Sequence, residues 1–67
     1  MTVKDFAAHF TTDLRVKVKN WATGEVLVED LAGELQESND RLIAETSKIE
    51  DWRLYMDHLE IEVTERW

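Results

Sequence analysis

The segment that most constrains the fold is residues 14–29, LRVKVKNWATGEVLVE, in which apolar and polar residues alternate on both sides of a turn-like centre, NWATG. Alternation around such a centre is typical of a β-hairpin with one buried face. We expect Lys19 to pair with Glu25 next to the turn. This register gathers four valines on one face, with Val18 opposite Val26 and Val16 opposite Val28. A slip of one residue would scatter the valines, so the pattern predicts the register as well as the hairpin.

Opposite charges meet on the other face of this predicted hairpin. The same register sets Lys19 against Glu25 and Arg15 against Glu29. Each such cross-strand pair contributes a few tenths of a kcal/mol. The apolar pattern and the charges therefore favour the same register.

The length of 67 residues indicates a single domain, 1–67, whose core supports only about 3–5 kcal/mol of net stability. The absence of cysteine excludes disulfides and thiolate metal sites, and it is compatible with a reducing compartment. No apolar run approaches the roughly 20 residues that span a bilayer, and no signal peptide opens the chain. We therefore expect a complete, cytoplasmic protein that does not enter membranes.

The net charge of −7 is unevenly distributed along the chain. Residues 1–21 have a net charge of +2, whereas residues 22–67 have a net charge of −9. This balance argues against direct binding of nucleic-acid phosphate, because counterion release would have the wrong sign. It favours a basic protein partner, which the acidic part would attract and steer. Solubility alone is the alternative reason for the acidity.

A short helix is predicted over residues 2–10. Thr2 can cap it, and Asp5 stands at the capping-box position. One apolar stripe follows the helical period: Val3, Phe6, Ala7 and Phe10. His9 lies off the stripe and is interpreted as a surface histidine. Residues 11–13 are expected to turn the chain into the hairpin.

A second short helix is predicted after Glu29. Asp30 is its expected N-cap, and residues 38–40 end it. Gly33 costs a helix about 1 kcal/mol relative to alanine, which favours a short one. The exposed face of this helix is acidic: Asp30, Glu34 and Glu37. Without a loop that presents further oxygen ligands we interpret this as a solvated face, and we expect no metal and no cofactor.

The C-terminal third of the chain allows two interpretations. Residues 59–65 alternate as a strand, and a strand needs a neighbour, so we favour a second hairpin of residues 47–56 with 59–65. Its turn is then placed at Asp57-His58. The alternative is a helix over residues 40–57, because apolar residues also recur there with a seven-residue spacing.

These elements predict an α+β domain in the order α-β-β-α-β-β. One antiparallel sheet has its apolar face covered by the two short helices, and its other face is wet. Glu60 and Glu62 are expected on the wet face. Trp21, at the tip of the first hairpin, either packs back onto the domain or anchors a partner.

Three stretches taken together carry a resemblance: the opening TVKDF, the strand–turn–strand RVKVKNWATGEVLVED that runs into LAGEL, and the closing LEIEV. They resemble the small accessory proteins of phages and mobile elements in Gram-positive bacteria. The resemblance covers most of the chain, but its motifs are fold-level and transfer no functional residue by position. It implies inhibition of host defence nucleases, as by the anti-CRISPR proteins that block Cas9. The sequence departs from the usual pattern at the last turn, where Asp-Gly is common and Asp57-His58 stands here.

Charge and resemblance together predict a non-enzymatic inhibitor that places its carboxylates in a basic groove of a larger protein, with a Cas9-like nuclease as the expected partner. The residues expected at the contact are Trp21, Asp30, Glu34, Glu37, Glu60 and Glu62. An enzyme is not expected, because the chain lacks a phosphate-binding glycine loop, a nucleophile elbow and a cysteine. The alternative is an assembly protein whose exposed strands pair into a homo-oligomer, so monomer and dimer both stay open.

Overall fold

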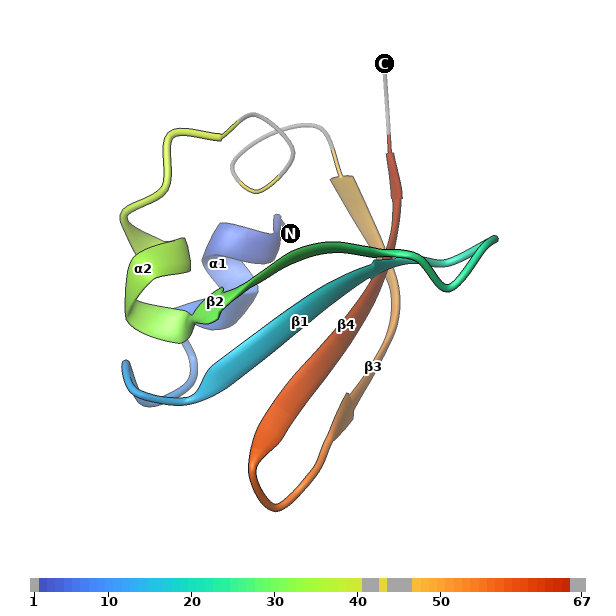
Figure 1. The fold of residues 1–67 in the computed structure, drawn as a ribbon. Helices are drawn as coiled ribbons and strands as arrows, with labels where there is room; N and C mark the ends of the chain where they lie inside the picture. The colour runs from blue at the N-terminus through green and yellow to red at the C-terminus, as the bar shows by residue number, and fades with distance from the viewer. Residues whose placement is uncertain (1, 41–42, 44–46, 66–67) are drawn as a thin grey trace.

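The computed structural model describes residues 2–40, 43 and 47–65 (Figure 1). Its elements are, in order, α1 (Val3–Ala7), β1 (Arg15–Asn20), β2 (Val26–Leu31), α2 (Ala32–Gln36), β3 (Ser47–Leu54) and β4 (His58–Glu65). The predicted α+β class and the order α-β-β-α-β-β are therefore confirmed. None of the described helices is long and apolar enough to cross a membrane.

The four strands form one mixed sheet in the order β2-β1-β4-β3. Both hairpins are antiparallel, but the central strands β1 and β4 run parallel, so the prediction of a wholly antiparallel sheet is wrong. The reason is the connection between the hairpins. After α2 the chain continues to β3 at the opposite edge from β2, as Figure 1 shows, and parallel neighbours require a crossover of this kind.

The tip of the first hairpin closes in a different register from the predicted one. The Asn20 N–H donates to the Glu25 carbonyl at 2.8 Å, and Gly24 adopts a φ of 75°, a conformation that favours glycine. Lys19 therefore opposes Val26, and the predicted pair of Lys19 with Glu25 is wrong. Because a shift of one residue turns a side chain to the other face, Val26 lies on the open face and is 46% exposed.

A β-bulge then returns the hairpin to the apolar register. The register shifts between Val18 and Lys19, and Leu27 is the extra residue on β2. Beyond the bulge Val18 opposes Val28, so the predicted pairs of both β1 valines are wrong by two residues. The turn and the bulge each shift the register by one residue, so together they return the side chains to the predicted face. Val16, Val18 and Val28 therefore still belong to the core, and only Val26 does not.

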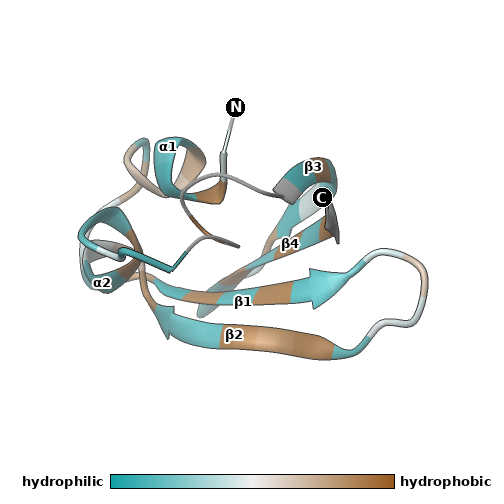
Figure 2. Ribbon diagram, turned by 90° about the horizontal axis from the view of Figure 1, so that it is seen from above, coloured by the Kyte–Doolittle hydropathy of each residue, from teal (hydrophilic) through white to brown (hydrophobic). Residues whose placement is uncertain are grey.

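The core lies between the helices and one face of the sheet (Figure 2). α1 contacts α2 and β3, and α2 contacts β2, so the two helices bridge the sheet from edge to edge. The Thr2–Asp5 capping box predicted for α1 is present, although the helix ends at Ala7 rather than at residue 10. The buried apolar residues are Val3, Ala7, Val16, Val18, Ala32, Leu35, Ile43, Leu59, Ile61 and Val63.

The second hairpin confirms the strand interpretation of the C-terminal region. Its turn lies one residue earlier than predicted, since the Tyr55 N–H donates to the His58 carbonyl at 2.8 Å with Met56 and Asp57 between them. The helical alternative for residues 40–57 is wrong from residue 47 onward, because β3 occupies that stretch. Within residues 41–46 only Ile43 belongs to the described part of the chain, and it is buried.

Candidate functional site

The start of α2 is held against the turn that precedes β1. The Ala32 N–H donates to the Leu14 carbonyl at 2.8 Å, and the Gly33 N–H donates to the Thr12 carbonyl at 2.9 Å. These bonds satisfy two of the free N–H groups at the helix start. Asp30 is not the N-cap that the sequence predicted, because Leu31 holds that position and Asp30 lies within β2. The Asp30 carboxylate accepts a hydrogen bond from the Leu31 N–H at 2.9 Å.

Gly33 makes this close approach sterically feasible. A Cβ atom at this position would lie 2.9 Å from the Thr12 Cβ and 3.1 Å from the Thr12 carbonyl oxygen. Both distances are shorter than ordinary van der Waals contacts. From the sequence, Gly33 is only a residue that destabilises a helix. In the structure, its lack of a side chain lets α2 lie next to the turn at residues 11–14.

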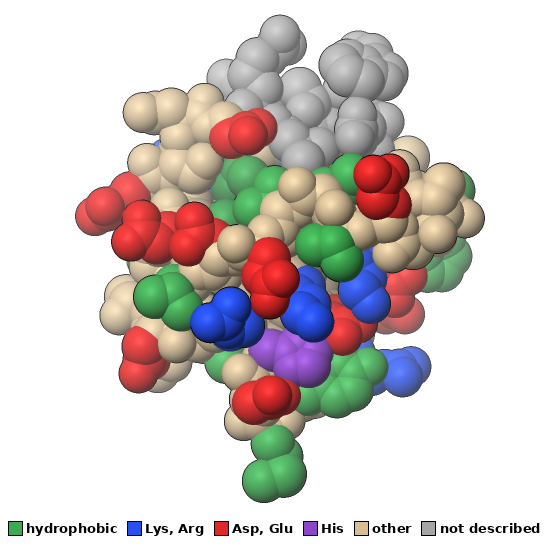
Figure 3. Space-filling model, in the orientation of Figure 1, with side chains coloured by type: hydrophobic (Ala, Val, Ile, Leu, Met, Phe, Trp, Pro, Cys, Tyr) green, Lys and Arg blue, Asp and Glu red, His purple; other side chains and the backbone are tan. Residues whose placement is uncertain are grey.

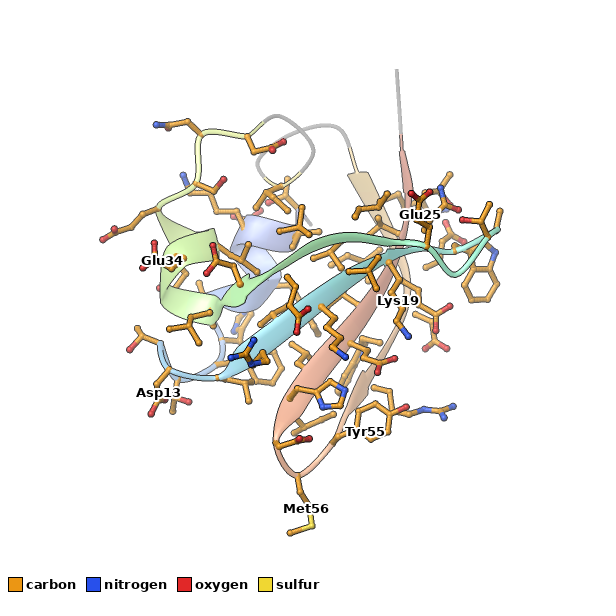
Figure 4. All side chains as sticks on the ribbon, viewed as in Figure 1. Asp13, Lys19, Glu25, Glu34, Tyr55 and Met56 are labelled. Atoms are coloured by element: carbon orange, nitrogen blue, oxygen red, sulfur yellow. The ribbon has the colours of Figure 1, made fainter. Side chains whose placement is uncertain are left out.

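An open hollow of about 390 Å³ lies where α2 meets this turn. It is lined by Thr12, Asp13, Leu31, Gly33, Glu34, Gln36 and Glu37, which we call the acidic hollow. Three of these residues are exposed carboxylates: Asp13, Glu34 and Glu37. None of the described lysine or arginine side chains forms a salt bridge with them. Figure 4 shows Asp13 and Glu34 at the same end of the molecule, opposite Glu25 at the hairpin tip.

The open face of the sheet has a different arrangement, because its charges alternate in sign (Figure 3). The parallel register sets a basic row of β1 beside a mostly acidic row of β4: Arg15 beside His58, Lys17 beside Glu60 and Lys19 beside Glu62. On the outer strands, Glu29 lies opposite Lys17, and Arg53 lies opposite Glu60. The basic N-terminal part of the chain is thereby placed against acidic residues of the C-terminal part.

Glu60 is the centre of an ion-pair cluster on this face. It accepts from the Lys19 ammonium at 2.9 Å and from the His58 Nε2 at 2.9 Å. The other ring nitrogen of His58 lies 2.7 Å from the Asp57 carboxylate, and the ring stacks on Tyr55 with centroids 4.6 Å apart. Since both ring nitrogens face carboxylates, the cluster suits a protonated imidazole that donates two hydrogen bonds.

The pKa values of the cluster follow from these contacts. The hydrogen bond to Glu60, and then the one to Asp57, raises the pKa of His58 above its usual range. The pKa of Glu60 is lowered by His58 and then by Lys19, and the pKa of Asp57 is lowered mainly by His58. An imidazole held in this way has no free nitrogen with which to take a proton from a substrate. The cluster therefore serves to fix the turn between β3 and β4.

The residues predicted to contact a partner are divided among three places. Glu34 and Glu37 line the acidic hollow, and Asp30 lies beside it at the end of β2. The two predicted carboxylates of β4, Glu60 and Glu62, belong to the open face of the sheet. Trp21 is 50% exposed at the hairpin tip, at the far end of β1 and β2 from α2 (Figure 1). The structure does not bring these three groups together.

Sequence reasoning missed two features of the site. The sequence predicts Asp13 only as part of a turn, and its place on the rim of the hollow depends on the contact between Gly33 and Thr12. The neutralisation of Glu60 by Lys19 depends on the parallel pairing of β1 with β4, for which a local pattern carries no signal. Within the described ranges, no three histidine, aspartate or glutamate side chains are arranged to hold a metal ion.

Comparison of the chain with models of protein families, with curated proteins and with solved structures finds no match.

Proposed function

We propose that this chain is a non-enzymatic binding protein that docks its acidic hollow onto a basic, nucleic-acid-binding groove of a larger protein and thereby inhibits that protein. The partner that we propose, from the sequence resemblance, is a Cas9-like nuclease of bacterial defence. The protein is then a phage or mobile-element product that acts in the cytoplasm of the bacterial host.

The observation that carries this proposal is the contrast between paired and unpaired carboxylates. On the open face, Glu60 and Glu29 have basic partners within the chain, at 2.9 and 3.4 Å. At the acidic hollow, Asp13, Glu34 and Glu37 have no salt bridge to any described lysine or arginine. A carboxylate that is already paired gains little from a further cation, so the hollow supports the proposal better than the sheet does.

The hollow also has a suitable form for such a contact. Three carboxylates surround an open concavity, and Leu31, which is 38% exposed, gives it an apolar patch. An arginine or lysine side chain of the partner would bring its charge to the rim and its methylene stem to the leucine. Basic channels of nucleic-acid enzymes contain such side chains to hold phosphates, which the carboxylates would replace.

The experiment uses charge reversal at the hollow. Glu34→Lys and Glu37→Lys, singly and together, are tested for binding to a purified Cas9–guide complex and for inhibition of DNA cleavage. We expect the double variant to bind at least about tenfold more weakly, with a smaller loss for each single variant. Glu25→Lys, at the exposed hairpin tip, changes the net charge equally and is the matched control for each single variant.

Three results would contradict the proposal. If the double variant binds and inhibits as the unchanged protein does, the acidic hollow is not the contact. If the unchanged protein leaves Cas9 cleavage unaffected at large molar excess, Cas9 is not the target. Binding that does not weaken with rising salt would exclude a mainly electrostatic contact of any kind.

A further inference from the structure

The outer edge of β3 and the turn after it form the most apolar exposed stretch of the described chain. The exposed fractions are 49% for Trp52, 52% for Leu54, 41% for Tyr55 and 106% for Met56. Figure 4 shows Met56 pointing away from the molecule at the end of this hairpin. β3 is also an edge strand, whose outer backbone groups are open to pairing. Apolar exposure and open backbone together indicate an interaction surface.

The hydrogen-bond pattern shows which backbone groups of β3 face outward. The Tyr55 N–H donates to the His58 carbonyl, so Tyr55 faces β4. The direction of the backbone N–H and C=O groups alternates along an antiparallel strand. The backbone groups of Arg53 therefore also point toward β4, whereas those of Trp52 and Leu54 point outward, away from the sheet. The Trp52 N–H agrees with this assignment, since it donates to the Asp51 carboxylate at 2.8 Å and not to β4.

The charges of β3 are complementary to those of a second β3 in one register. If two copies pair antiparallel about a twofold axis with outward residues opposed, the axis can pass through any residue of β3 beyond its bulge, that is from residue 51 to residue 54. An axis at Leu54 sets Arg53 against Tyr55 and makes no ion pair. An axis at Asp51 sets Asp51 against itself, and an axis at Arg53 sets Arg53 against itself. An axis at Trp52 sets Asp51 of each copy against Arg53 of the other, which makes two cross-strand ion pairs.

We propose that β3 pairs with β3 of a second copy about a twofold axis at Trp52, and that this joins the two four-stranded sheets into one continuous sheet. The two tryptophans then oppose each other across the axis on the face that carries the helices. Trp52 is already oriented for this contact by Phe6, whose ring centroid lies 5.4 Å away. The Trp52 N–H exchanges the Asp51 carboxylate for a carbonyl of the second copy, and Asp51 is released to pair with Arg53.

The other edge of the sheet does not offer this complementarity. The charged residues of β2 are Glu29 and Asp30, both acidic, so two copies of this strand can form no cross-strand ion pair in any register. Pairing through β3 leaves the acidic hollow free, because the hollow lies at the β2 edge. The dimer thus goes beyond the proposed function and can fail or hold independently of it.

The test is a charge exchange followed by light scattering and sedimentation over a range of protein concentrations. Arg53→Asp sets two aspartates of one copy against two of the other, and Asp51→Arg does the same with arginines. We expect the unchanged protein to dimerise and each single variant to associate about a hundredfold more weakly. An equimolar mixture of the two single variants should form a heterodimer, because each then faces the opposite charge.

The mixture also guards against a trivial loss of folding, since two misfolded variants would not restore association. The double variant Asp51→Arg with Arg53→Asp should dimerise with itself. Arg15→Asp, which makes the same change in net charge on β1, should leave the dimer intact. The proposal is overturned if the unchanged protein stays monomeric at its highest soluble concentration. It is equally overturned if the mixed variants stay monomeric, or if the single variants dimerise as the unchanged protein does.

Discussion

The two faces of the sheet are held by different interactions, although they are made from alternate residues of the same strands. Val18 is fully buried against the helices, and its neighbour Lys19 points to the open face and pairs with Glu60. The covered face gains its stability from the burial of apolar area. The open face depends on partly solvated ion pairs, which individually stabilise little. We therefore expect substitutions on the two faces to differ in size and in their response to pH.

The largest effect is expected for Val18→Asp on the covered face. This change buries a carboxylate without a partner, at a cost of about 3–5 kcal/mol, which equals the whole stability of a domain of this size. Cooperative thermal unfolding, measured by circular dichroism, should disappear. Ala22→Asp adds the same group at the exposed hairpin tip and should melt close to the unchanged protein. A sharp transition of Val18→Asp near the normal temperature would show that Val18 is not in the core.

A smaller effect is expected for Lys19→Met on the open face. The change removes one of the two cationic partners of Glu60, and the melting temperature should fall by a few degrees. Lys17→Met is the control, because Lys17 lies on the same strand and face and forms no salt bridge with the described residues. If the melting temperature falls equally for both variants, the effect comes from the overall charge of the face and not from the Lys19–Glu60 pair.

The open face should also make stability depend on pH. The raised pKa of His58 gives stability that is full below its unfolded value of 6.5 and is lost as the pH rises through the folded pKa. The lowered pKa values of Glu60 and Asp57 give stability that is full above the unfolded values of 4.5 and 3.8 and is lost at lower pH. Stability from this cluster is therefore greatest between pH 4.5 and 6.5.

Thermal melts of His58→Gln across this range check the pH dependence. The variant should be less stable than the unchanged protein near the middle of the window, and the difference should shrink toward alkaline pH. His9→Gln removes the other histidine, whose ring makes no hydrogen bond or ion pair with the described residues, and should follow the unchanged protein. A constant difference between His58→Gln and the unchanged protein at all pH values would contradict the cluster.

The smallest effect on stability is expected at the acidic hollow. Because Glu34 and Glu37 have no salt bridges to described residues, Glu34→Lys with Glu37→Lys should change the free energy of unfolding by no more than about 0.5 kcal/mol. Chemical denaturation measures this difference. A loss of several times that size would mean that the carboxylates stabilise the fold, and binding losses of the same variant could then not be assigned to the contact.

Local patterns in the sequence were sufficient for the elements of the fold. The capping box at Thr2 and Asp5, the alternation in residues 14–29 and the alternation in residues 59–65 each depend on neighbours in the chain, and each predicted an element that the structure confirms. Three of the four residue pairs predicted within the first hairpin are wrong, because the turn and the bulge at Leu27 shift the register in ways that alternation does not encode. The fourth, Arg15 with Glu29, is present as a salt bridge at 3.4 Å, although Glu29 opposes Lys17 in the ladder.

The arrangement of charge was decided by the tertiary structure. The sequence alone shows an acidic part and a basic part, but whether an acid is free depends on which strand lies beside it. The parallel pairing of β1 with β4 gives Glu60 a lysine from a segment 41 residues away, whereas the contact of Gly33 with Thr12 leaves Glu34 on the rim of a hollow. Charges interact through space over a few ångströms and not along the chain, so only the packed fold separates paired carboxylates from unpaired ones.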